Sequence, residues 1–94
     1  MNFEKGDVIS IMTLVGEIVA KYVESEDNHT LIVEKPCLFI SNDQGQGGFV
    51  PYVCMTGNTD KGMFIKDYIG VIITSAEAEA AYIQSTTGIQ LATA

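Results

Sequence analysis

The 94-residue chain contains no arginine and no tryptophan, and its five lysines are outnumbered by twelve acidic residues. The formal net charge of −7 excludes a basic tail or stripe that would hold nucleic acid by charge alone. No apolar run reaches the roughly 18 residues of a membrane span, and residues 1–7 lack the apolar segment of a signal peptide. These absences predict an intracellular protein, located in the cytoplasm.

Reactive and metal-binding residues are also few, with two cysteines and one histidine. Cys37 and Cys54 lie within apolar runs and lack the CxxC spacing of metal motifs, which predicts buried free thiols. The acidic residues at positions 24, 26 and 27 lack the spacing of a calcium-binding loop, and we interpret them as a solvated turn. With no nucleophile–base motif either, we expect no enzyme, no cofactor and no metal site.

The apolar residues that are present, 47% of the chain, indicate one domain with a small core that oligomerisation would complete. Their dominant period is two, which predicts β-strands. We expect bends at Gly16 and Gly70, a bend or sheet edge at Pro36, and a flexible glycine-rich loop over residues 41–48. The predicted strands cover residues 8–12, 15–24, 29–40, 49–56 and 63–74.

Residues 75–87 change to an alanine-rich pattern that predicts a C-terminal helix. Its cap is either Thr74, in a capping box with Glu77, or Ser75, and Gly88 is the expected terminator. The inner face is predicted to carry Ala76, Ala80 and Ile83. The expected fold is mainly β, a small, five-stranded, strongly bent antiparallel barrel over residues 8–74 with a C-terminal helix; SH3-like, OB-like and Sm-like barrels all fit.

The segment MFIKDYIGVIITS at residues 63–75 resembles the second Sm motif of Hfq-type proteins, M-x-Y-K-H-x-I-S-x-V. The matching positions are Met63, Lys66, Ile69 and the apolar Ile72. Residues 8–33 resemble the first Sm motif, with a Gly-Glu-Ile sequence at 16–18 and a return strand at 30–33. The chain is thus similar to Sm-like (LSm, Hfq-type) proteins, and in particular to the small ones of marine cyanophages, which implies an SH3-like barrel and, for a phage protein, the host cytoplasm.

An Sm-like fold implies a homo-oligomeric ring, in which the fourth strand of one subunit pairs with the fifth strand of the next. Such pairing would remove two apolar strand edges that are a liability for a monomer. The ring-interface residues that this resemblance implies are Phe49, Tyr52, Val53, Met63 and Ile65.

The same resemblance implies an RNA-binding site at Lys66, Asp67, Tyr68, Asn28 and His29. Hfq-type proteins have Lys-His where this chain has Lys66-Asp67, so an acid that repels phosphate stands where a donor is expected. Lys66 either contacts RNA or pairs with an acid such as Asp67 of a neighbouring subunit. Two hypotheses follow: a ring that binds single-stranded RNA, and an acidic structural or protein-interaction ring that binds none.

Overall fold

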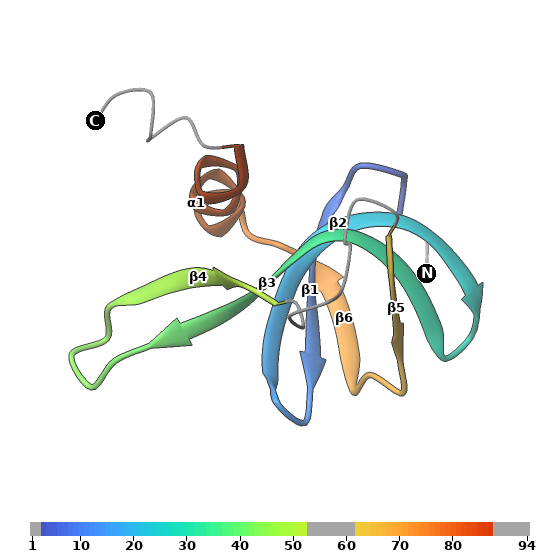
Figure 1. Ribbon diagram of the computed structural model, residues 1–94, viewed down its shortest axis with the longest axis horizontal. Helices are drawn as coiled ribbons and strands as arrows, with labels where there is room; N and C mark the ends of the chain where they lie inside the picture. Colours follow the sequence, from blue (N-terminus) through green and yellow to red (C-terminus); the bar gives the residue numbers. More distant parts are fainter. Residues whose placement is uncertain (1–2, 53–61, 88–94) are drawn as a thin grey trace.

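A computed structural model describes residues 3–52 and 62–87 of the chain (Figure 1). The prediction of a mainly β fold with a C-terminal helix is confirmed, but the described residues contain six strands, not five. No helix in these ranges is long and apolar enough to cross a membrane. The elements are β1 (Val8–Thr13), β2 (Gly16–Asp27), β3 (Thr30–Ser41), β4 (Gly47–Pro51), β5 (Met63–Lys66), β6 (Gly70–Ile73) and α1 (Ala76–Thr87).

The strands form one antiparallel sheet in the order β4-β3-β2-β1-β6, with β5 also paired to β3. β5 lies along the first third of β3, and β6 lies along β1 at the opposite edge. Because the described residues include no β5–β6 ladder, the sheet is not closed into the predicted barrel. Figure 1 shows β1, β2, β3, β5 and β6 curving around one interior, while the β3–β4 hairpin extends away from it.

The predicted strand over residues 63–74 is divided in two by a corner at residues 67–69. Asp67 has a φ of 55°, in the left-handed region, which ends the extended conformation of β5. The Asp67 N–H donates to the His29 carbonyl at 2.9 Å, and the Ile69 N–H donates to the Met12 carbonyl at 2.8 Å. The expected bend thus occurs at Asp67, and Gly70 only begins β6.

A bulge in β3 confirms the bend predicted at Pro36. Val19 pairs with Cys37 and Lys21 pairs with Glu34, so two residues of β3 lie opposite one residue of β2. The first of the two, Lys35, has a φ of 50°. The bulge separates the part of β3 that lies in the curved sheet from the part that forms the hairpin with β4.

Both faces of β1 are buried where the helix covers the sheet. The interior cluster contains Ile9, Ile11, Leu31 and their neighbours, and Val8 belongs to a second cluster on the other face. That second cluster is completed by Val19, Cys37 and the helix residue Tyr82.

Tyr82, rather than the predicted alanines, anchors the helix. Ala76 and Ala80 are exposed, whereas Tyr82 is fully buried and its hydroxyl donates to the Lys35 carbonyl at 2.6 Å. Of the two candidate caps, Ser75 is the one used, because its Oγ accepts from the Ala78 N–H at 3.3 Å. Thr74 instead forms a buried 2.8 Å hydrogen bond with the Ser10 hydroxyl. The expected terminator, Gly88, lies outside the described residues.

The segment predicted to be a flexible loop is an ordered hairpin turn. The side-chain oxygen of Asn42 accepts from the N–H groups of Gln44 and Gln46, at 2.9 and 3.0 Å. The Phe39 ring occupies the space that a Cβ at position 47 would need, so Gly47 serves close packing. Phe39 also contacts Phe49 edge-on, with ring centroids 5.3 Å apart.

Removing the Tyr82 hydroxyl should destabilise the fold more than removing an exposed one. We expect Tyr82→Phe to lower the free energy of unfolding by about 1 kcal/mol, because a short, partly buried hydrogen bond to the bulge is lost. The matched variant Tyr68→Phe loses an exposed 3.3 Å bond and should cost less than about 0.5 kcal/mol. Urea denaturation followed by circular dichroism measures both, and equal losses would contradict the anchoring role of Tyr82.

Candidate nucleic-acid interface

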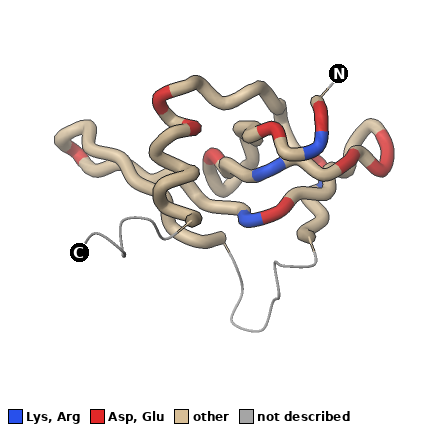
Figure 2. The backbone as a smooth tube through the Cα atoms, turned by 90° about the horizontal axis from the view of Figure 1, so that it is seen from above, with Lys and Arg blue, Asp and Glu red and all other residues tan. Residues whose placement is uncertain are grey.

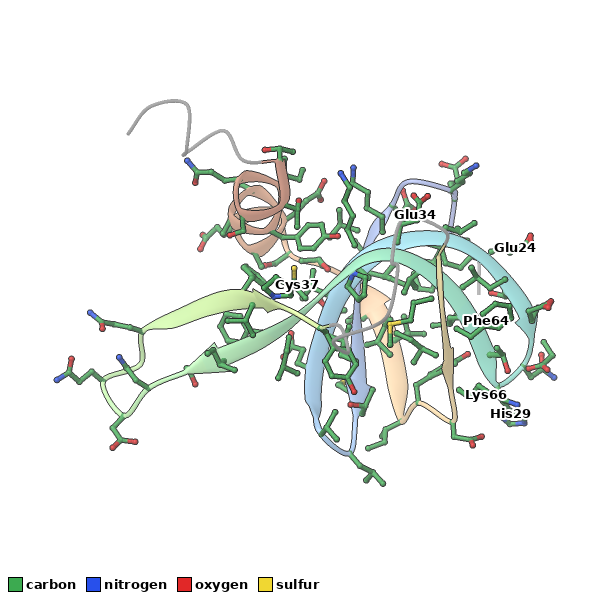
Figure 3. The ribbon with its side chains drawn as sticks, in the orientation of Figure 1. Glu24, His29, Glu34, Cys37, Phe64 and Lys66 are labelled. Carbon is green, nitrogen blue, oxygen red and sulfur yellow. The ribbon has the colours of Figure 1, made fainter. Side chains whose placement is uncertain are left out.

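The five residues predicted to contact RNA come from two distant segments that the fold brings together. Asn28 and His29 form the turn between β2 and β3, and Lys66, Asp67 and Tyr68 belong to β5 and the corner after it. We call the assembly of residues 27–30 and 66–69 the Lys66 corner. Figure 3 shows Lys66 and His29 near one another at the same end of the sheet.

Hydrogen bonds to main-chain carbonyls hold the two halves of the Lys66 corner together. Besides the bond from the Asp67 N–H to the His29 carbonyl, the Tyr68 hydroxyl donates to the Asn28 carbonyl at 3.3 Å. Thr30 and Lys66 are register partners in the β3–β5 ladder. The side chains of Asn28, His29, Lys66 and Asp67 are exposed, so the corner presents them to solvent on a fixed backbone.

Asp27 stabilises the turn and adds negative charge to the corner. Its carboxylate accepts from the His29 N–H at 2.7 Å. This bond is the main cause that lowers the pKa of Asp27; a side-chain bond from Thr30 and the nearby His29 and Lys66 lower the pKa further. Lys66 therefore lies within the electrostatic reach of a carboxylate. Figure 2 shows that acidic positions outnumber lysines along the described backbone.

An apolar groove opens beside the Lys66 corner, between the β1–β2 turn and β5. Its volume is about 360 Å³. We call it the β5 groove; its lining includes Leu14, Val15, Tyr52, Phe64, Lys66 and Asp67. Sequence reasoning missed this groove because residue 14 fell between two predicted strands and residue 15 was assigned to the second of them. Two apolar side chains in a turn, where polar residues are usual, were the available signal.

Four of the five residues predicted for the ring interface lie in the described part of the chain. Ile65 is a core residue with 6% of its surface exposed, and Met63 and Tyr52 pack against the same core. Phe49 packs edge-on against Tyr82, and Val53 lies outside the described residues. The side chains of Phe49, Met63 and Ile65 point to the core or the helix, because each alternates with an outward neighbour. The apolar side chains that β5 and β6 expose most are Phe64, Ile72 and Ile73.

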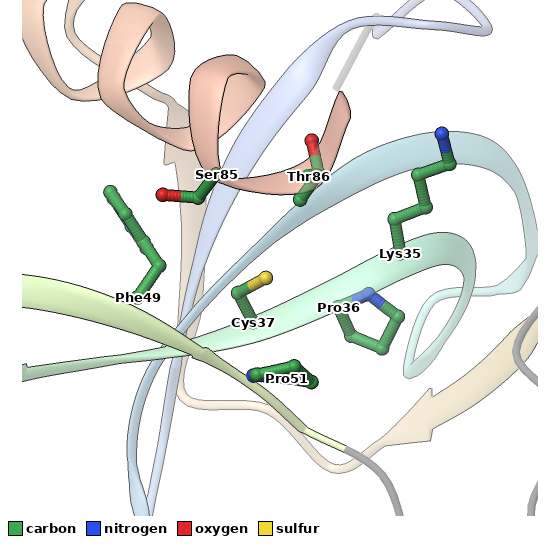
Figure 4. A pocket seen from close by; sticks show the side chains of 7 residues that line it. All are labelled: Lys35, Pro36, Cys37, Phe49, Pro51, Ser85 and Thr86. Carbon is green, nitrogen blue, oxygen red and sulfur yellow. The ribbon is translucent and has the colours of Figure 1, made fainter. Parts of the chain in front are cut away.

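A second cavity, of about 250 Å³, lies between the β3 bulge and the end of α1 (Figure 4). Cys37 lines it, with Lys35, Phe49 and Thr86 nearby. The Cys37 thiol is free and buried, as predicted, and burial raises its pKa, so the unreactive protonated form dominates near neutral pH. Cys54 lies outside the described residues. Nothing in this cavity resembles a reactive site.

No protein-family model, curated protein or solved structure gives a significant match to this chain. The Sm-like resemblance over residues 8–74 therefore stays a prediction.

The lowered pKa of Asp27 makes a pH-dependent contribution to stability. A carboxyl whose pKa is lower in the folded state than its ordinary 3.8 stabilises the fold above that value. The contribution is lost as the pH falls through the lower, folded value. We expect Asp27→Asn to be less stable than Asp43→Asn near neutral pH, and this difference to disappear in strong acid. Urea denaturation across pH tests this; a difference that is independent of pH would contradict it.

Proposed function

We propose that this chain is an Sm-like protein that assembles into a homo-oligomeric ring and binds single-stranded RNA at the Lys66 corner. The observation that carries the proposal is the bond from Asp67 to His29. It joins the two segments to which the resemblance assigns RNA contacts, although 37 positions separate residues 29 and 66.

The course of the chain through β5 and β6 supports an Sm-like fold. The segment that resembles the second Sm motif runs along β3, turns at residues 67–69 and continues along β1 on the opposite edge. At position 67 the Sm pattern has His or Gly, and here Asp67 has a φ of 55°. Glycine adopts left-handed conformations without strain, and Asp and His are enriched there among other residues. Asp67 thus changes the charge at this position but still fits the left-handed backbone conformation.

Two strand edges support the assembly into a ring. Among the described residues, β5 pairs only with β3, and β6 pairs only with β1. Ile72 and Ile73 on β6 are 61% and 50% exposed. Open edges with apolar side chains recruit further strands. A β5 that pairs with the β6 of the next subunit gives a head-to-tail contact that can close, in place of the pairing between the strands predicted at 49–56 and 63–74 that the resemblance implies.

The charge of the corner favours the second hypothesis, an acidic ring for structure or protein interaction that binds no RNA. Lys66 shares the Lys66 corner with Asp27 and Asp67, and the net charge of −7 multiplies with each subunit. Phosphate is repelled by such a surface unless base contacts compensate. RNA binding must therefore be demonstrated separately from assembly.

The ring requires a discrete oligomer in solution. Light scattering after size exclusion should give a multiple of 10.2 kDa for the native chain. Ile72→Glu should shift the mass toward the monomer, because it places a charge beside the β6 edge. Ile40→Glu changes a comparably exposed residue on the β3–β4 hairpin and should keep the oligomer. A native chain that elutes as a 10.2 kDa monomer would rule out the ring.

The RNA site is tested with labelled U-rich and A-rich oligonucleotides, by fluorescence anisotropy at several salt concentrations. We expect Lys66→Ala to weaken binding about tenfold, the effect of losing one charge-assisted hydrogen bond of roughly 1.5 kcal/mol. The slope of log affinity against log salt should become shallower by about 0.7 per lost phosphate contact.

Lys5→Ala is the matched control, because it removes the same charge from an exposed position outside the corner and should leave the affinity nearly unchanged. No binding by the native chain at low salt and micromolar concentration would reject the RNA function and leave the acidic ring.

A further inference from the structure

The β5 groove has the lining of a site for an apolar group. Leu14 and Val15, which are 94% and 64% exposed, come from the β1–β2 turn, and Phe64, 59% exposed, comes from β5. The buried residues Ile18 and Ile65 complete the lining. The volume of about 360 Å³ is at the small end of the roughly 300–1,000 Å³ of ligand sites. An exposed aromatic ring beside such a groove is the usual platform for an unpaired nucleobase.

The two charged residues of the groove lining are of opposite sign. Lys66 and Asp67 belong both to the lining and to the Lys66 corner. Tyr52 and Thr13 add one hydroxyl each to the lining, and Thr13 already donates its hydroxyl hydrogen to the Gly16 carbonyl at 2.8 Å. Among the described residues, a ligand therefore meets one cation, one carboxylate, two hydroxyl groups and apolar surface, which suits a nucleotide with its phosphate near Lys66.

We propose that the β5 groove binds one unpaired base that carries an exocyclic amino group, and that Asp67 discriminates against uracil. An ionised carboxylate can only accept hydrogen bonds. It accepts from the amino groups of cytosine, adenine and guanine. Uracil has a carbonyl oxygen where cytosine has its amino group, and its one donor, N3–H, lies between two carbonyl oxygens that repel a carboxylate. This inference rests on the proposed RNA binding at the Lys66 corner and names the class of base that is bound there.

The backbone of Asp67 is fixed beside the groove. Its φ of 55° and the bond from its N–H to the His29 carbonyl fix the residue at the end of β5. Asparagine tolerates the same left-handed conformation, so Asp67→Asn changes the chemistry of the side chain and keeps the corner. The amide has both a donor and an acceptor, and so it can pair with uracil as well as with cytosine.

Cytosine and uracil have the same size, so a comparison of oligo-C with oligo-U of equal length isolates the amino group. We expect the native chain to bind oligo-C about tenfold more tightly than oligo-U, as measured by anisotropy at one salt concentration. Asp67→Asn should bring the ratio of the two affinities close to one. Asp43→Asn removes the same charge from the β3–β4 turn and should leave the ratio unchanged.

The outcomes separate this inference from the RNA function itself. Equal affinities for the two oligonucleotides, a preference for oligo-U, or a ratio that Asp67→Asn does not change would overturn the discrimination and leave RNA binding intact. No binding of either oligonucleotide would reject both.

A second variant tests whether the base occupies the groove. Because the chain has no tryptophan, Phe64→Trp introduces a single indole into the groove. Its fluorescence should be quenched when oligo-C binds, since the base stacks on the indole. Ile40→Trp places the probe on the distant hairpin and should show no quenching. Binding detected by anisotropy without quenching in Phe64→Trp would place the base elsewhere and overturn the assignment of the groove.

Discussion

The β3 bulge at Lys35 and Pro36 is the constraint on which the rest of the structure depends. Strand β3 pairs with β2 on both sides of the bulge, with β5 before it and with β4 after it. The extra residue redirects the strand between these two parts of the sheet. The carbonyls of both bulge residues have hydrogen-bond partners: the Tyr82 hydroxyl donates to Lys35 and the Tyr52 N–H donates to Pro36. The helix is thus fixed to the sheet at the point where the sheet changes direction.

Asp67 is a second residue with a left-handed backbone conformation, and it redirects the chain after β5 as Lys35 redirects β3. It ends β5 at one edge of the sheet and sends the chain to the opposite edge, where β6 pairs with β1. The gap that is left between β5 and β6 is spanned only by residues 67–69, so each strand keeps one edge without a partner in the described part of the chain. The same corner therefore explains both why the barrel is not closed within one chain and where a neighbouring copy would close it.

The sequence predicted what depends on local pattern and missed what depends on distant contacts. Alternation of apolar residues located β1, β2 and β3, and the alanine-rich segment located the helix. The break at Asp67 was missed because hydropathy carries no information on φ. Tyr82 was missed because its burial depends on a carbonyl 47 positions away. The Lys66 corner was predicted from a motif resemblance, whereas the β5 groove was not, since its walls come from a turn and a strand far apart in the sequence.

Both the backbone conformation and the charge of Asp67 bear on the proposed RNA binding. The left-handed corner restricts the residue to a few types, and among them only aspartate brings a negative charge. With Lys66 as the single lysine of the corner, phosphate attraction is weak, so the proposed RNA binding would have to come from contacts to bases, which depend less on salt. A ring would repeat the site around its circumference, so several weak sites could hold one strand together. An acidic chain of this design would bind RNA selectively rather than tightly.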